Sequence, residues 1–279
     1  MDAIRRPAAT YPTDAQLAAR ADDEALMEGL LWGIRSREFE IDYQPRFDLR
    51  RRAINAVEAL VRWRHPRHGL LAPALFVPLA TEAGHIRTLT DWVLTQAITD
   101  QATLARAGFD LEVSVNIAGA LLLDRTFADQ IDRVIEAAPS RVCFDITEAG
   151  VLENPPLALE TIDRLKSAGV GISIDDYGAG LSSLRYLKQI AADELKIHET
   201  LIADMALSQR DAMVVRSTID LAHGLGMKVT AEGVESAATF QLLAAMGCDN
   251  VQGHLIAKPE PLNELLSVLR QDGDKVSYG

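Results

Sequence analysis

Short β-rich runs alternate with amphipathic segments along most of the chain. Runs of β-branched and apolar residues that are typical of strands occupy 41–47, 54–63, 111–117, 141–148, 170–176, 193–198, 227–233 and 250–256. Segments with apolar residues at helical spacing occupy 91–108, 127–138, 157–169, 211–226 and 236–247, and an earlier helical pattern begins at Asp22. Several of these segments end in glycine, a common helix terminator. The alternation predicts repeated βα units.

The first two runs are connected differently from the others. Only residues 48–53 separate them, which is too short for a parallel crossover, so we expect an antiparallel pair. With eight strand candidates and helices after most of them, the sequence predicts a modified (β/α)8 TIM-type barrel with an antiparallel first strand. An open doubly wound sheet is the alternative, and the absence of a glycine-rich loop after the first strand disfavours it.

The length of 279 residues suits one barrel with short extensions. We expect the barrel over 22–272, a flexible tail or linker stub over 1–21, and a C-terminal tail over 273–279. The net charge of −12 argues against a long nucleic acid or an anionic membrane surface as partner. No apolar run approaches the roughly 18 residues of a membrane span, and the N-terminus lacks a signal core. These features, with two cysteines in apolar runs, predict a cytoplasmic protein.

Polar residues stand near the ends of most predicted strands, which is where TIM-type barrels carry their chemistry. They are Glu58, Asn116, Glu148, Asp175, Asp176, Lys196, Glu232 and Gln252. A single carboxylate at a strand end is usually a helix cap or a solvated loop residue. Five of them around one mouth would repel one another, and divalent cations would relieve that repulsion. The pattern therefore indicates one shared site.

Oxygen ligands of this kind suit hard ions such as Mg²⁺, Mn²⁺ or Ca²⁺. Two such ions about 3.5–4 Å apart can activate a water and stabilise the leaving oxygen in phosphodiester cleavage, and Lys196 could hold the water or offset charge on the phosphate. Barrel aldolases and enolases also combine acids with a lysine. Lys196 would then be a Schiff-base nucleophile or a general base, so the residues alone leave the reaction open.

Eight motifs in order carry a resemblance to a known family. They are YQP (43–45), Glu58-Ala59-Leu60, SVNIA (114–118), DITE (145–148), IDDYGAG (174–180), ELKI (194–197), AEGVE (231–235) and GCDNVQGHLIAKP (247–259). In these motifs, over about residues 24–268, the chain resembles the EAL-domain family of cyclic di-GMP phosphodiesterases. The resemblance implies a metal-dependent hydrolase that opens cyclic di-GMP to linear pGpG and lowers this second messenger in bacterial signalling.

The resemblance also implies roles for individual residues. Glu58, Asn116, Glu148 and Asp175 would hold the first metal ion; Asp175 and Asp176 would hold the second, with Glu232 near it. Lys196 would hold the catalytic water, with Glu58 and Glu232 completing the catalytic set. Gln44, Arg62 and Gln252 would contact the substrate or support the site, and Glu235 would anchor a loop. The implied cofactors are two divalent cations, Mg²⁺ or Mn²⁺, with Ca²⁺ inhibiting. Homodimerisation, linked to activity through 176–183, and an upstream regulatory domain or partner are also implied.

Two positions depart from the family pattern. His198 stands where Leu-Lys-Ile is normally followed by Asp, and His254 where Gln-Gly is normally followed by Tyr or Phe. Alternation along a strand places His198 on the face of Lys196 and His254 on that of Gln252. The changes are either tolerated drift or alterations of the mouth. They keep open a second interpretation, a catalytically degenerate domain that senses cyclic di-GMP or binds another protein.

Overall fold

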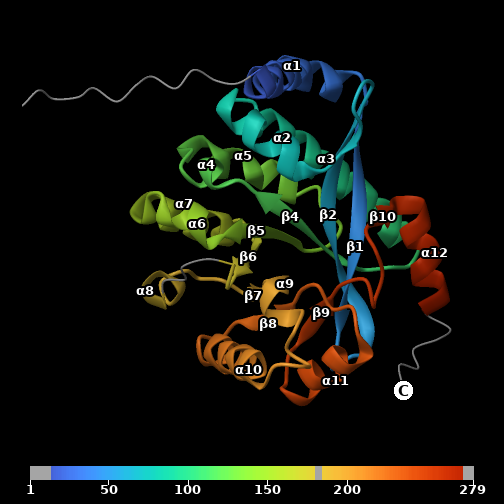
Figure 1. Cartoon of the computed structure of the whole chain (residues 1–279), viewed down its shortest axis with the longest axis vertical. Coiled ribbons are helices and arrows are strands. Elements are labelled where there is room, and N and C mark those ends of the chain that lie inside the picture. Colours follow the sequence, from blue (N-terminus) through green and yellow to red (C-terminus); the bar gives the residue numbers. More distant parts are fainter. Residues whose placement is uncertain (1–13, 180–183, 273–279) are drawn as a thin grey trace, which may run out of the picture.

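The structure is a computed structural model that describes residues 14–179 and 184–272 (Figure 1). Eight strands form a closed barrel. In chain order they are β1 (Phe39–Asp48), β2 (Ala53–His65), β4 (Glu112–Ile117), β5 (Val142–Thr147), β6 (Gly171–Tyr177), β7 (Glu194–Ile197), β8 (Lys228–Ala231) and β9 (Asn250–Gln252). Two short strands extend the sheet: β3 (Gly69–Leu71) pairs with β2, and β10 (Glu260–Pro261) pairs with β1.

Strand β1 closes the barrel. It pairs antiparallel with β2 on one side and with β9 on the other, whereas β2, β4, β5, β6, β7, β8 and β9 follow one another in parallel. The predicted barrel with an antiparallel first strand is confirmed, and the open doubly wound sheet is excluded because both of its would-be edges are joined. Residues 48–53 form the tight turn between β1 and β2 that the sequence indicated.

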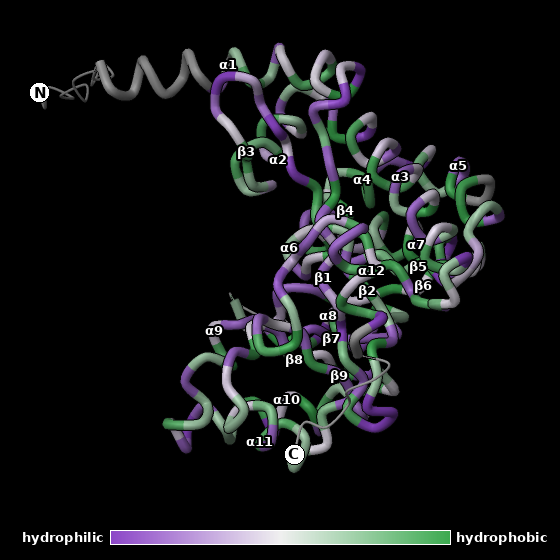
Figure 2. The backbone as a smooth tube through the Cα atoms, turned by 90° about the vertical axis from the view of Figure 1, so that its right-hand side faces the viewer, coloured by the Kyte–Doolittle hydropathy of each residue, from purple (hydrophilic) through white to green (hydrophobic). Residues whose placement is uncertain are grey.

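Helices surround the barrel. The longer ones are α1 (Asp14–Arg35), α2 (Pro73–Glu82), α3 (Ile86–Arg106), α5 (Arg125–Ile135), α7 (Pro155–Ser167), α10 (Gln209–Gly224), α11 (Ala237–Ala245) and α12 (Leu262–Asp272). Helix α1 lies beside α2 at one end of the molecule, and α10 and α11 lie at the other end (Figures 1 and 2). Helix α12 packs on β1. No helix within the described residues is long and apolar enough to cross a membrane.

Four one-turn helices follow the C-terminal ends of the central strands. They are α4 (Gly119–Leu122) after β4, α6 (Glu148–Leu152) after β5, α8 (Leu184–Leu187) after β6 and α9 (Glu199–Ile202) after β7. Side chains cap two of them: Thr147 accepts a hydrogen bond at the start of α6, and His198 does so at the start of α9. These turns fix the backbone around the barrel mouth.

Alternation along the strands divides apolar from polar side chains. In β7, Leu195 and Ile197 belong to the hydrophobic core, whereas Glu194 and Lys196 join polar networks with residues of other strands. All four are buried. The core between strands and helices is therefore apolar, and the barrel interior is lined largely by charged and amide groups, which must satisfy one another.

Several elements differ from the sequence prediction. Helix α1 begins at Asp14, eight residues before the expected boundary at Asp22; residues 1–13 lie outside the described part of the chain, as do 273–279. The predicted strand at 250–256 is shortened to β9, because Gly253 turns the backbone at a φ of 154°. Elements α2, β3 and α12 were not predicted.

Candidate active site

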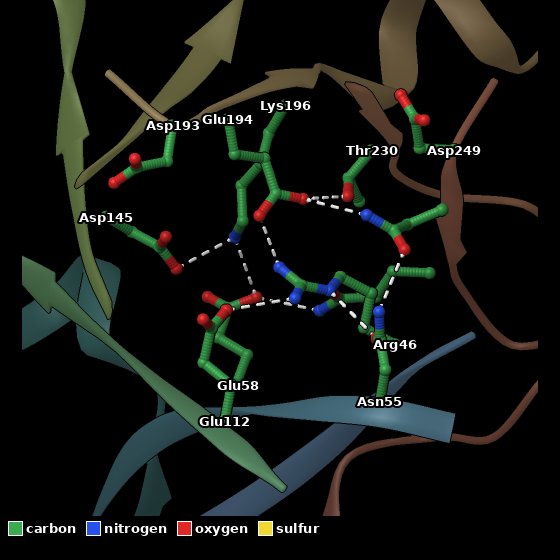
Figure 3. A network of polar contacts seen from close by, with 12 residues as sticks. Arg46, Asn55, Glu58, Glu112, Asp145, Asp193, Glu194, Lys196, Thr230 and Asp249 are labelled. Atoms are coloured by element: carbon green, nitrogen blue, oxygen red, sulfur yellow. Dashed lines mark hydrogen bonds and ion pairs between the residues drawn. The ribbon is translucent and has the colours of Figure 1, made fainter. Parts of the chain in front are cut away.

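Two polar networks fill the barrel interior (Figure 3). The deeper one is centred on Arg46 of β1, whose guanidinium pairs with Glu194 of β7 and, at 2.9 Å, with Glu112 of β4. Glu194 also accepts hydrogen bonds from Thr230 and Asn250. Burial lowers the pKa of Arg46, but the two carboxylates more than offset this and raise it above its ordinary value. This network ties β1 to β4 and β7, neither of which pairs with it in the sheet.

Lys196 of β7 is the centre of the second network, which lies toward the mouth. Its side chain is 1% exposed, and its Nζ lies 2.9 Å from Asp145 Oδ2, 3.1 Å from both Glu58 Oε2 and Glu232 Oε1, and 3.8 Å from Asp175 Oδ1. Burial lowers the pKa of Lys196, but these carboxylates raise it well above its ordinary value. Four carboxylates from β2, β5, β6 and the residue after β8 thus share one ammonium.

Glu58 is the best satisfied of the four carboxylates. Asn116 Nδ2 donates to Glu58 Oε1 at 2.7 Å, and Gln252 Nε2 donates to Oε2 at 2.7 Å, beside Lys196. Burial raises the pKa of Glu58, but Lys196, Asn116 and Gln252 together hold it below its ordinary value. Glu58 is therefore held ionised and fixed in direction.

The other three carboxylates have raised pKa values. Burial is the main cause in each case, and repulsion from neighbouring carboxylates adds to it; Lys196 offsets only part. The pKa of Asp145 rises to about 7 and that of Glu232 to about 8. Among the described residues, Asp145 Oδ2 pairs with Lys196 at 2.9 Å, whereas Oδ1 accepts no hydrogen bond. The cluster carries more negative charge than one lysine balances.

The donor set suits divalent cations by its chemistry. Carboxylate and amide oxygens are the ligands that Mg²⁺ and Mn²⁺ prefer, and a cation would relieve the repulsion that raises these pKa values. Across residues 14–179 and 184–272, however, no three His, Cys, Asp or Glu side chains converge at metal-binding spacing. In this arrangement the Lys196 ammonium lies between the carboxylates.

The remaining predicted residues lie at different distances from this cluster. Gln44 accepts a hydrogen bond from Gln252 at 3.1 Å, so the two amides form a chain that ends on Glu58. Asp176 follows Asp175 with a φ of 59°, and its half-exposed side chain turns toward the mouth, where it lies 3.8 Å from His198. Glu235 lies 3.4 Å from His254 at the rim of the same cavity.

The structure does not bring two predicted residues into the cluster. Arg62 donates to Asp42 at 2.9 Å across the β1–β2 pair and lines neither cavity at the mouth. Glu148 is the buried first residue of α6, and its charge adds to burial, the larger cause, in raising the pKa of Tyr177. It also lines neither cavity.

Asp145 occupies the position in the cluster that the sequence analysis gave to Glu148. Both belong to DITE, and Glu148 was the predicted ligand because it stands at the strand end. Strand alternation contained the missing signal. Asp145 shares parity with Ser173 and Asp175 on paired β6, and the paired register of β5 and β6 aligns Asp145 with Ser173, which places it inside the barrel.

Two cavities meet at the mouth. One, of about 400 Å³, is mostly apolar and lies between β2, β4 and helices α2 and α3. The other, of about 300 Å³, is polar and is lined by the residues after β7, β8 and β9. Leu60, Asp175 and Asp176 line both. A ligand with two lobes could therefore place one in each cavity and its central linkage at the carboxylates.

Comparison with known proteins is consistent with this geometry. A family model described as the EAL domain matches residues 24–259. The chain belongs to the EAL domain family. "Cyclic di-GMP phosphodiesterase NbdA" of Pseudomonas aeruginosa is 39% identical over 260 residues, which are 91% of this chain and 33% of that protein. The bifunctional diguanylate cyclase/cyclic di-GMP phosphodiesterase MucR of the same organism is 33% identical over 259 residues, covering 91% of this chain and 38% of that protein.

Solved structures resemble this EAL domain closely. A structure titled "PaMucR Phosphodiesterase, c-di-GMP complex" superposes with a TM-score of 0.80 at 33% identity, covering 86% of this chain and 99% of that one. A form of the EAL enzyme Bd1971 bound to cAMP and cyclic-di-GMP gives a TM-score of 0.82 at 29% identity, covering 90% of this chain and 70% of that one. The present chain spans about a third of the length of the curated relatives it matches.

Proposed function

We propose that this EAL domain is a metal-dependent phosphodiesterase that hydrolyses cyclic di-GMP to linear pGpG. The observation that carries the proposal is the pair of cavities that share Leu60, Asp175 and Asp176. Cyclic di-GMP has two nucleoside lobes joined by phosphodiesters, so its scissile phosphate would lie against the carboxylate cluster. The names of the relatives and the titles of the solved complexes support the same substrate.

We assign the metal-binding role to oxygen donors at the mouth. Glu58, Asn116, Asp145 and Asp175 would hold one ion, and Asp175, Asp176 and Glu232 the other. Asp145 replaces Glu148 in this assignment, because its carboxylate joins the Lys196 cluster whereas Glu148 lies at the start of α6. Bound Mg²⁺ or Mn²⁺ would supply Lewis-acid polarisation of the phosphate and would lower the pKa of a bound water. Ca²⁺, which prefers more ligands and a looser geometry, is expected to inhibit.

The chain's own residues then position the reactants. Lys196, held by Glu58 and Asp145, would hold the attacking water. Glu58 is fixed as an ionised acceptor by Asn116 and Gln252. In the reaction a water oxygen bonds to phosphorus, the bond from phosphorus to a ribose 3′-oxygen breaks, and that oxygen receives a proton. The linear product keeps the new 5′-terminal phosphate.

Chromatographic separation of nucleotides tests the proposal. The wild-type chain incubated with cyclic di-GMP and Mg²⁺ or Mn²⁺ should yield pGpG, and Glu58→Gln, which keeps the size of the side chain, should abolish turnover. Glu160→Gln changes an exposed carboxylate on α7 and serves as the matched control. If the wild type yields no pGpG with either ion, the enzymatic proposal is wrong.

The second candidate is a degenerate domain that binds cyclic di-GMP without cleaving it. The position of Lys196 between the carboxylates and the two histidines at His198 and His254 favour it. Calorimetric binding of cyclic di-GMP without pGpG formation would support this candidate.

We also retain the proposals of homodimerisation and of a regulatory domain outside this chain. The part of the relatives that this chain does not match is long enough for further domains. Light scattering coupled to size-exclusion chromatography tests the dimer, for which a mass near twice 30.4 kDa is expected.

A further inference from the structure

His198 has one ring nitrogen committed to the backbone. Its Nδ1 lies 3.3 Å from the backbone N–H of Thr200 and 3.0 Å from Thr200 Oγ1, and it caps α9. A backbone N–H can only donate, so Nδ1 must carry a lone pair. The neutral imidazole therefore bears its proton on Nε2.

The other ring nitrogen faces Asp176. Nε2 lies 3.8 Å from Asp176 Oδ1, and both residues line the 300 Å³ cavity. The backbone is fixed on both sides: the His198 N–H donates to the Tyr177 carbonyl at 3.1 Å, and Asp176 has a left-handed φ of 59°. The imidazole is thus a preset donor beside a carboxylate whose side chain is 52% exposed.

We infer that His198 is a positioning residue that directs the Asp176 carboxylate toward the metal ions. The inference rests on the proposed function, because it assigns Asp176 to a metal site. The Nε2–Oδ1 distance of 3.8 Å is longer than a hydrogen bond, so the role requires a rotation of the Asp176 side chain that would bring Oδ1 to the fixed Nε2–H and leave Oδ2 to an ion. Hydrogen bonds to the second oxygen of a ligating carboxylate orient it and strengthen metal binding.

Two other roles for His198 are orientation of Lys196 and capping of α9 alone. His198 does not orient Lys196 directly, since the ion pairs of Lys196 that the described residues form are with four carboxylates. A role limited to capping α9 would need Nδ1 alone. Asparagine places its amide oxygen where Nδ1 lies, and glutamine places its amide nitrogen near Nε2. The pair of variants therefore divides capping from donation.

Calorimetric titration of Mn²⁺, with thermal melting of the same samples, tests the inference. His198→Asn keeps the cap and loses the donor, so Mn²⁺ binding should weaken on the order of ten-fold while the melting temperature is unchanged. His198→Gln keeps a donor and weakens the cap, so Mn²⁺ binding should stay close to wild type while the melting temperature falls. His223→Asn is the control, because it removes another imidazole–carboxylate pair, with Asp249 at 2.8 Å, away from the mouth.

The outcomes are distinguishable from failure of the proposed function. If the wild type binds Mn²⁺ and His198→Asn binds it equally well, the positioning role is wrong and the proposed function stands. The reverse pattern, with melting affected in His198→Asn and binding affected in His198→Gln, also overturns the role. If the wild type neither binds Mn²⁺ nor forms pGpG, both are wrong.

Discussion

The buried carboxyl groups of Asp145 and Glu232 should make the metal-free protein less stable as the pH rises. Burial and neighbouring carboxylates raise the pKa of Asp145 from 3.8 to about 7 and that of Glu232 from 4.5 to about 8. Between pH 5.5 and 7 the folded chain holds protons that the unfolded chain has released. Stability from this source is therefore full at low pH and is lost as the pH rises through the folded pKa values.

The size of the effect follows from linkage. Each retained proton changes the free energy of unfolding by about 1.4 kcal/mol per pH unit. Asp145 is half deprotonated at pH 7, so it alone contributes a loss of roughly 1–2 kcal/mol between pH 5.5 and 7. Glu58 has a lowered pKa, so it stays ionised in both states over this range and adds no slope. Urea denaturation in a chelator, followed by circular dichroism at half-unit pH steps, measures the slope.

Paired variants separate the cluster from the rest of the titrating groups. Asp145→Asn should flatten the slope by about 1 kcal/mol per pH unit between pH 5.5 and 7, whereas Asp163→Asn, on the exposed face of α7, should not change it. Saturating Mg²⁺ should stabilise the wild type most at the higher pH. Equal slopes for the wild type and Asp145→Asn would refute the raised pKa of Asp145.

Three further predictions concern packing and ions. Gly119→Ala places a Cβ 2.5 Å from the Gly150 backbone between α4 and α6, so its midpoint in urea should fall, whereas Gly224→Ala enters open space and should leave the midpoint nearly unchanged. Arg46→Met leaves Glu194 buried without its positively charged partner and should lower the free energy of unfolding by about 3–5 kcal/mol in the same assay. A loss below about 1 kcal/mol would contradict the network. Ca²⁺ added to a Mn²⁺ assay should lower the rate of pGpG formation, and a rate that rises with Ca²⁺ would count against the metal assignment.

The barrel could be predicted from the sequence because its periodicity is local. Alternation of strand and helix patterns placed the eight barrel strands, and the short turn at 48–53 fixed the antiparallel pair. Helix α12 could not be placed in the same way, because its docking on β1 brings together segments that are far apart in the chain. The start of α1 at Asp14 was missed because a run of small residues carries little periodic signal.

Most residues of the candidate site were predicted from the sequence, but some of their contacts were not. Glu58, Asn116, Asp175, Lys196, Glu232 and Gln252 lie together, as the strand ends indicated. Asp145 was missed because proximity to the strand end was weighted above inward parity. The pairing of Arg62 with Asp42 depends on the register of β1 against β2, which the motifs alone do not specify.

Product analysis of cyclic di-GMP turnover tests the central claim most directly. With Mg²⁺ or Mn²⁺ the wild-type chain should convert cyclic di-GMP to pGpG, and Glu58→Gln should retain its fold and yield none. Formation of pGpG by the wild type alone would support a phosphodiesterase built on the Lys196 cluster. If the wild type binds cyclic di-GMP but forms no pGpG with Mg²⁺ and none with Mn²⁺, the claim of phosphodiesterase activity is contradicted.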